Sequence, residues 1–298
     1  MINRSLLKQS IKANWVLWLV TTLGVGIMLV IINVIVGKSG IGSSEIDQLT
    51  LAQYYAALDM SGSGLTVAGL FQAFGIDPSR LEQLGTMDLN LAIHDMFYTM
   101  AGLLLPILYV VVTGNKLVAN QVDRGSMAYI LSSPIKRKKV IVTQIVYLVG
   151  SIIGMYVILF GLDVVSQYIG YGEVDVLEVL LMNIGGLVTI LSIAGIAFFA
   201  SSLFNLSRHS LALGGGLAVF FFLTKIMGLF GSDNFVNMGF GVKEMRVFNF
   251  MTIISLFDTA SISELSVNFI WKFGIMIGVA AVAFISSIFI FDKKDLPL

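Results

Sequence analysis

Six long apolar stretches constrain the fold of this chain more than any other feature of its sequence. They cover about residues 15–37, 93–113, 140–166, 177–204, 211–230 and 268–291. Each is long enough for a helix to cross a hydrocarbon core of about 30 Å, which takes roughly 20 apolar residues. The sequence therefore predicts an all-α integral membrane protein with six transmembrane helices.

The composition supports this fold class and excludes several kinds of site. Of the 298 residues, 57% are hydrophobic and 12% are charged, whereas charged residues make up about 25% of an average soluble domain. A water-soluble fold of this size could not bury so much apolar surface. The chain has no Cys and only two histidines, His94 and His209, on opposite sides of the predicted membrane, so we expect no thiolate nucleophile and no metal site. No residues build a catalytic triad, so we expect no catalytic residue.

The basic residues gather on one side of the predicted membrane. That side receives residues 1–14, 114–139, 205–210 and 292–298, which carry 12 Lys and Arg residues but only three acids. The opposite side carries four basic residues and most of the acids. By the positive-inside rule, both termini are expected in the cytoplasm.

The loops differ in length and divide the chain into regions. Residues 1–14 are expected to form a cytoplasmic amphipathic N-terminal segment, and residues 15–298 the six-helix transmembrane domain. Residues 38–92 and 231–267 are expected to be extracytoplasmic. The second of these contains the apolar run FNFMTIISLF, which is too short to span and indicates an interfacial or re-entrant element.

The cytoplasmic loop between the second and third spans is the most informative stretch. Gly125 and Pro134 bracket an apolar turn, residues 126–133, that is too short to span and has basic surroundings. This spacing predicts a short helix along the membrane surface. It either rests on lipid headgroups, with the basic residues 136–139 as anchors, or docks onto a cytoplasmic motor through Met127, Tyr129, Ile130 and Leu131.

This loop resembles that of the permease subunits of type-2 ABC exporters, the ABC-2 membrane family. In that family an acidic residue, a Gly-Ser/Thr pair, an apolar turn and a Pro-x-basic segment follow the second span. The matching residues, in order, are Asp123, Gly125, Ser126, Met127, Tyr129, Ile130, Leu131, Ser133, Pro134 and Arg137. The six-span layout and the charged ending FDKKDLPL are also similar. The sequence departs from the family at Ala128, where Glu is frequent, and at Gln144, where Lys is frequent.

The resemblance implies a function and a set of partners. The matching loop is then the coupling helix, seated in a separate ATPase, and the chain is the membrane permease subunit of an ATP-driven exporter. ATP and Mg bind to the ATPase, which hydrolyses the ATP, so no cofactor and no enzymatic activity are expected in this chain. The implied partners are cytoplasmic ABC ATPase subunits, a second permease copy or a sister permease, and membrane lipid, with no nucleic acid. The implied location is the cell membrane of a bacterium.

The apolar spans and outer segments favour an amphipathic or hydrophobic cargo, such as a peptide, a lipid-like molecule or a drug. Two other functions stay open. An ion-coupled secondary transporter needs acids or unwound helices near the midplane, but the central thirds of the spans contain no Asp, Glu, Lys or Arg. A non-transporting membrane scaffold or sensor would use residues 38–92 to bind its ligand.

Three ionisable residues, Asp163, Lys225 and Lys272, lie within or beside the predicted spans. Such a residue costs about 2.5–3.5 kcal/mol at a helix centre on translocon scales. All three fall in one outer layer of the predicted membrane. Either Asp163 pairs with one of the lysines and forms a candidate outer gate, or both lysines extend to the headgroups while Asp163 meets water.

Overall fold

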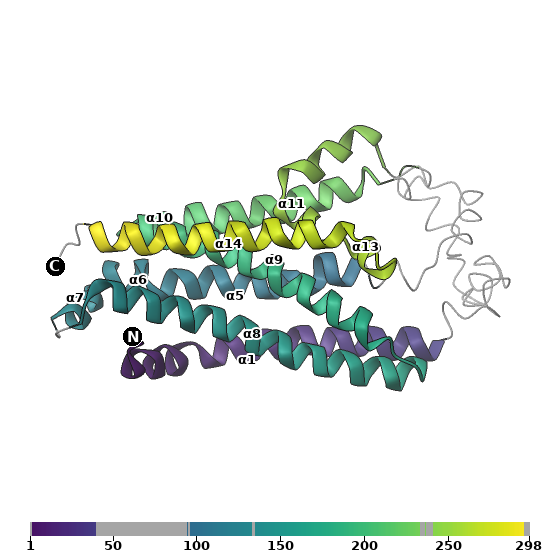
Figure 1. The fold of residues 1–298 in the computed structure, drawn as a ribbon, viewed down its shortest axis with the longest axis horizontal. Helices are drawn as coiled ribbons and strands as arrows, with labels where there is room; N and C mark the ends of the chain where they lie inside the picture. The colour runs from purple at the N-terminus through teal and green to yellow at the C-terminus, as the bar shows by residue number, and fades with distance from the viewer. Residues whose placement is uncertain are drawn as a thin grey trace, which may run out of the picture.

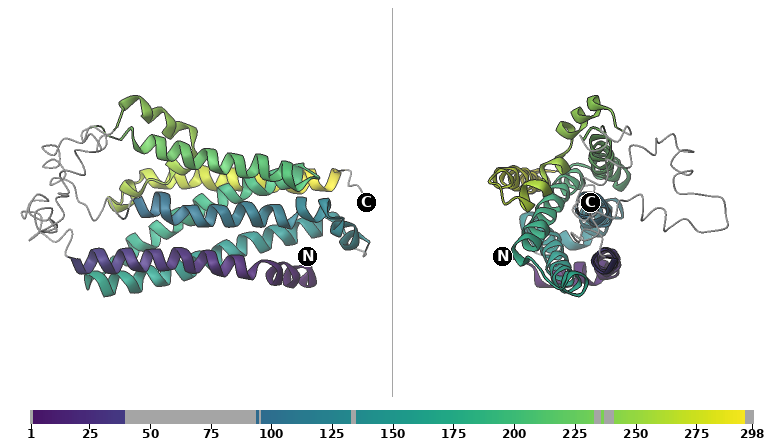
Figure 2. Two further views of the ribbon diagram at one scale, coloured as in Figure 1. Left: turned by 180° about the vertical axis from the view of Figure 1, so that it is seen from behind. Right: turned by 90° about the vertical axis from the view of Figure 1, so that its right-hand side faces the viewer.

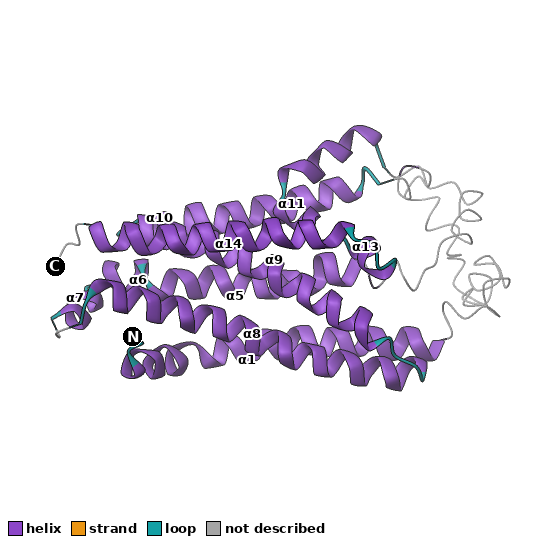
Figure 3. Cartoon of the chain, viewed as in Figure 1, coloured by secondary structure: helices purple, strands orange, loops and turns teal. Residues whose placement is uncertain are grey.

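The computed structural model describes residues 2–39, 94, 96–132, 135–232, 236 and 241–294. All regular structure within these residues is helical (Figure 3). Six helices are long and apolar enough to cross a membrane, and they cover Arg4–Ile35, Phe97–Asp123, Arg137–Tyr171, Val176–Leu203, Ser207–Leu229 and Asn268–Lys293. This confirms the predicted fold class.

Four of the spans are single helices, and the other two are composite. The first, third, fourth and sixth spans are α1 (Arg4–Ser39), α8 (Arg137–Tyr171), α9 (Val176–Leu203) and α14 (Asn268–Lys293). The second span consists of the π-helical turn η2 (Phe97–Ala101), α5 (Gly102–Leu117) and α6 (Ala119–Asp123). The fifth consists of α10 (Ser207–Ser210), the π-helical η3 (Leu211–Gly215) and α11 (Gly216–Leu229).

Four short helices lie in the connections that the structure describes. The connection between the second and third spans contains α7 (Ser126–Leu131). The connection between the fifth and sixth spans contains the 3-10 helices η4 (Lys243–Met251) and η5 (Ile253–Leu256), followed by α13 (Thr259–Ser263).

The spans form one elongated bundle (Figures 1 and 2). α1 packs along α8, α9 packs along α14, and α5 lies between α1 and α9. The centre of the bundle is filled by fully buried side chains such as Tyr109, Ile152, Met155, Ile190 and Phe198. α11 contacts η4 along much of its length and has few contacts with the rest of the bundle.

The start of α1, the end of α14 and the short helix α7 lie at the same end of the bundle, called here the α7 end. α13 lies at the opposite end, called here the α13 end (Figure 1). This placement agrees with the predicted order of loops. That the α7 end faces the cytoplasm stays a prediction.

The amphipathic segment predicted for residues 1–14 continues into the first span without a break, because α1 is helical from Arg4 to Ser39. Its basic stripe, Arg4, Lys8 and Lys12, is exposed. The opposite face is buried, and Ser10 there donates a hydrogen bond of 2.8 Å from Oγ to Oε1 of Gln144 on α8. The segment is therefore an extension of the bundle. Residues 40–92 of the predicted outer segment lie outside the described residues.

The connection after the fifth span packs into the α13 end of the bundle. η4 lies beside α11, while Ile254, Phe257 and Ile262 are buried in the common core. Phe257 sits so close to Gly185 on α9 that a Cβ atom added there would lie 2.2 Å from its Cε2 atom. The predicted interfacial or re-entrant element is thus a set of short helices, and most of residues 233–240 lie outside the described part.

Candidate functional site

The first candidate site is α7, which a glycine introduces. Gly125 precedes the helix with φ 72° and ψ −2°, a left-handed conformation that L side chains rarely adopt. The carbonyl of Gly125 accepts a hydrogen bond of 3.1 Å from the amide of Ala128. The glycine of the Gly-Ser pair therefore lets the chain turn sharply out of α6 and start a new helix.

The two faces of α7 have opposite environments. Met127 is 2% exposed and belongs to the core of the bundle, whereas Tyr129 is 87% exposed. Ile130 and Leu131 are half-buried and pack against that core. Met127 is therefore the buried anchor of α7 in this chain, and Tyr129 is the large side chain that α7 presents outward. Which of the predicted docking residues contact an ATPase stays a prediction.

Three further residues of the predicted coupling set are bonded within the chain. Ser126 donates from Oγ to the carbonyl of Gln121 over 3.1 Å. Oδ2 of Asp123 accepts a hydrogen bond of 3.2 Å from the amide of Ser207. Arg137 donates from Nη1 to the carbonyl of Lys294 over 2.8 Å. Ser133 and Pro134 lie outside the described residues.

The second candidate site surrounds Asp163 on α8, near the α13 end. Its side chain is fully buried, and its carboxylate accepts four hydrogen bonds. Oδ1 accepts from Nδ2 of Asn33 at 3.0 Å and from Nε2 of Gln167 at 3.1 Å. Oδ2 accepts from Nδ2 of Asn183 at 2.8 Å and from the hydroxyl of Tyr98. One carboxylate thus joins α1, η2, α8 and α9.

The network extends beyond the carboxylate. Nδ2 of Asn33 also donates to Oγ of Ser166 over 2.8 Å, and Oδ1 of Asn33 lies 3.0 Å from Nε2 of His94. Because the amide nitrogen of Asn33 donates to Asp163, its oxygen is the acceptor, which assigns the proton to Nε2 of His94. All four groups around Asp163 direct an N–H or O–H donor at it, so both carboxyl oxygens act as acceptors.

The lysines of the predicted outer gate lie elsewhere. Lys272 forms an ion pair with Asp258, and Nζ of Lys272 also lies 5.8 Å from the centre of the Trp271 ring. Lys225 lies on α11, whereas the partners of Asp163 come from α1, η2, α8 and α9. In this conformation Lys272 pairs with Asp258 rather than with Asp163, and a gating role for the three residues stays a prediction.

Asp258 belongs to the connection that precedes α13. Its carboxylate accepts from the amide of Ser261 at 3.2 Å and from the ammonium group of Lys272. Burial alone would raise the pKa of Asp258, but the hydrogen bonds from Lys272 and Ser261 outweigh it and hold the pKa below its usual value. The ion pair thus ties the connection to the first turns of α14.

Sequence reasoning missed the neutral partners of Asp163, although one signal was present. Asp163, Ser166 and Gln167 are spaced i, i+3 and i+4, which places them on one face of a helix. An asparagine in each of the neighbouring spans, Asn33 and Asn183, completes the set. Polar side chains at matching depth in several apolar spans therefore indicate such a network better than opposite charges do.

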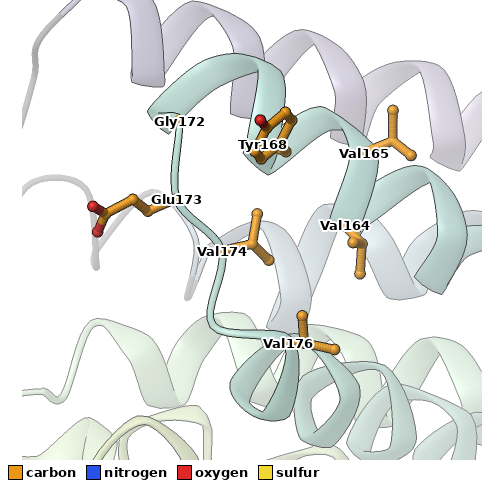
Figure 4. A pocket seen from close by; sticks show the side chains of 7 residues that line it. All are labelled: Val164, Val165, Tyr168, Gly172, Glu173, Val174 and Val176. Carbon is orange, nitrogen blue, oxygen red and sulfur yellow. The ribbon is translucent and has the colours of Figure 1, made fainter.

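A shallow pocket near the turn between α8 and α9 carries little chemistry. Its volume is about 450 Å³, and it is lined by Val164, Val165, Tyr168, Gly172, Glu173, Val174 and Val176. The carboxylate of Glu173 points away from the other lining side chains (Figure 4). Binding sites for small molecules usually contain a few convergent polar groups, which this hollow lacks among its described lining residues.

Comparison with known proteins gave one match. The model of a family described as "ABC-2 family transporter protein" matches residues 6–296. No curated protein and no solved structure matched the chain. The match covers all six spans as well as α7 and the network around Asp163.

Proposed function

The chain belongs to the ABC-2 transporter family, and on this basis we propose that it is the permease half of an exporter powered by a separate ATPase. Family membership and the six spans establish a multi-pass membrane permease. The ATPase partnership, the outward direction of transport and the cargo are the proposed parts.

One observation carries the proposal: α7 presents an exposed tyrosine on a helix that is anchored in the bundle. Tyr129 is 87% exposed, and Met127, two residues earlier, is 2% exposed. Aromatic side chains of this kind are frequent energetic centres of protein interfaces. Because Met127 holds α7 to the core, a force applied at Tyr129 reaches the spans instead of moving a loose loop.

In this proposal the chain itself hydrolyses nothing. ATP and Mg bind to the ATPase subunits, and ATP binding changes the affinity of these subunits for two conformations of the permease. A partner can shift such an equilibrium only through this difference in affinity. The transport pathway then lies between this chain and a second permease, which is either another copy or a sister subunit.

The cargo we propose is amphipathic or hydrophobic. Large apolar side chains are exposed along α11, including Val219, Phe220, Leu223 and Met227. In a membrane such a surface meets lipid tails, a second permease or an apolar cargo. The positive charge near α7 favours a cytoplasmic position for the α7 end, and a bacterial plasma membrane is the proposed location.

The buried carboxylate of Asp163 favours one second candidate, an ion-coupled secondary transporter. Ionisable residues inside a membrane are functional sites by default. However, the four groups bonded to Asp163 all direct N–H or O–H donors at it, and donors repel a cation. Transport that persists without ATP and follows an ion gradient would favour this candidate over the ATP-driven exporter.

The test uses the ATPase that copurifies with the wild-type chain, with both proteins reconstituted in nanodiscs. Replacing Tyr129 and Leu131 together by Asp should release the ATPase or abolish its stimulation by the permease. The matched control is Phe250→Asp, which charges a side chain that is 91% exposed on η4. If the double variant binds and stimulates the ATPase like the wild-type chain, α7 is not the docking element.

A further inference from the structure

The two residues that flank α7 are each bonded to a different later span. Asp123 ends α6, and its Oδ2 atom accepts a hydrogen bond of 3.2 Å from the amide of Ser207. Ser207 is the first residue of α10 and thus begins the fifth span. A carboxylate at a helix N-terminus pairs with an amide that has no partner inside the helix and is favoured by the helix dipole.

On the other flank, Arg137 begins α8 and reaches the end of the sixth span. Its Nη1 atom donates to the carbonyl of Lys294 over 2.8 Å, one residue beyond α14. The next residue, Lys138, forms an ion pair of 3.4 Å with Asp292 in the last turn of α14. Carbonyls at a helix C-terminus have no partner inside the helix, and a guanidinium is a strong donor for them.

The fourth span closes these bonds into a ring. Nζ of Lys294 donates to the carbonyl of Ser202 at the end of α9 over 3.0 Å, and Oγ of Ser201 accepts a hydrogen bond of 2.9 Å from the amide of Ala119. Burial lowers the pKa of Lys294 to about 8.

We infer that Asp123 and Arg137 are positioning residues that transmit a displacement of α7 to the start of the fifth span and the end of the sixth. The inference rests on the proposed function, because it takes α7 as the element that the ATPase moves. α7 has only six residues, so a movement of this helix acts on both flanks at once. The family resemblance placed Asp123 and Arg137 in the ATPase contact, whereas their bonds connect α7 to the spans.

The two roles make different demands on Asp123. The bond to Ser207 needs an acceptor oxygen but no charge, so Asp123→Asn should preserve it and Asp123→Ala should remove it. An electrostatic contact with an ATPase would be lost in both variants. Asp123 is exposed, so neither substitution disturbs a buried side chain.

The donor of the same bond can be removed separately. Ser207→Pro deletes the amide hydrogen at the first helical position, where proline is well tolerated. The preceding residue, Leu206, is extended at φ −97° and ψ 128°, which is the conformation that a following proline favours. The control Ser207→Ala keeps the amide but loses Oγ, which accepts a 2.7 Å hydrogen bond from Asn115.

The experiment measures span movement and ATPase binding in the same reconstituted complex. The chain has no native Cys, so spin labels can be placed at Val176, at Leu223 on the fifth span and at Val267 before the sixth, all of them exposed. Pulsed EPR then gives the ratio of the two conformations with and without ATP. The distance from Val176 to Leu223 reports the fifth span, and the distance from Val176 to Val267 reports the sixth.

ATP should change the ratio of the two conformations read from the Val176–Leu223 distance. We expect Asp123→Ala and Ser207→Pro to reduce this change by about 2- to 13-fold, which is the factor that corresponds to the free energy of one hydrogen bond. The double variant should be no worse than either single one, because both remove the same bond. Asp123→Asn and Ser207→Ala should behave like the wild type. Arg137→Ala should reduce the ATP-induced change read from the Val176–Val267 distance. The control Arg124→Ala, which removes another exposed arginine near α7, should not reduce it. The Kd of the ATPase measured without ATP should stay unchanged in every variant.

Two results would overturn the inference while leaving the proposed function in place. One is a weaker Kd shared by Asp123→Ala and Asp123→Asn, which would make Asp123 an ATPase contact. The other is a normal span response in Asp123→Ala, Ser207→Pro and Arg137→Ala. If the wild-type chain neither binds nor responds to an ATPase, the proposed function fails and this inference fails with it.

Discussion

Replacing Asp163 by alanine should be one of the most destabilising single changes in the described part of the bundle. The substitution removes the acceptor for four hydrogen bonds that join four elements. Three of the donors would stay buried, because Asn33, Asn183 and Tyr98 are 2%, 5% and 9% exposed. A buried donor without a partner costs about 1–3 kcal/mol, so we expect a loss of about 3–5 kcal/mol after partial rearrangement, similar to breaking a buried ion pair.

The assay is thermal unfolding of the purified chain, followed by circular dichroism in detergent. At about 2 °C per kcal/mol for a chain of this size, Asp163→Ala should lower the midpoint by about 6–10 °C. Asp163→Asn should lie between this variant and the wild type, because its single amide oxygen can replace only part of the acceptor. The matched control is Asp175→Ala, which removes the N-cap bonds to the amides of Leu177 and Glu178 and should cost about 1 kcal/mol. If Asp163→Ala is no less stable than Asp175→Ala, the network does not hold the four elements together.

The remaining predictions concern packing and pH. Gly185→Ala would place a Cβ atom 2.2 Å from Phe257 and should cost about 1–3 kcal/mol through overpacking; the double variant with Phe257→Leu should recover part of this in the same unfolding assay. Because the hydrogen bonds from Lys272 and Ser261 together outweigh burial and lower the pKa of Asp258, these bonds should stabilise the fold above the unfolded pKa of the carboxyl, and this stability should be lost as the pH falls through its folded pKa. Asp258→Asn should flatten the acid side of a stability profile. Burial lowers the pKa of Lys294 from 10.5 to about 8, so the folded state binds fewer protons between these values and stability should rise with pH there; Lys294→Met should remove the rise.

The spans could be predicted from the sequence because length and apolarity alone decide whether a helix can cross a membrane. The stretches expected at residues 177–204 and 268–291 are the helices Val176–Leu203 and Asn268–Lys293. The third helix exceeds its predicted stretch, residues 140–166, at both ends and runs from Arg137 to Tyr171. Helical hydrogen bonding continues into polar flanks, whereas hydropathy marks only the part that suits lipid.

The contacts between spans could not be predicted in the same way. Hydropathy gives the depth of Asp163 along its helix but not the direction in which the side chain points or which helices are neighbours. A carboxylate in lipid suggested a lysine partner, yet amides and a hydroxyl solvate it. The same limit applies to α7, since six residues contain too few turns to tell the anchoring face of Met127 from the presenting face of Tyr129.

The most direct test of the proposed function is site-specific photocrosslinking from position 129 in native membranes. A photoreactive phenylalanine analogue replaces Tyr129, whose exposure allows the exchange, and a second variant carries it at the exposed Phe250 on η4, which packs beside α11. The account predicts that position 129 forms an adduct containing a soluble ATPase with a nucleotide-binding P-loop, and that position 250 does not. An adduct at 129 that contains only lipid or another copy of this chain, or an ATPase adduct from position 250, would contradict it.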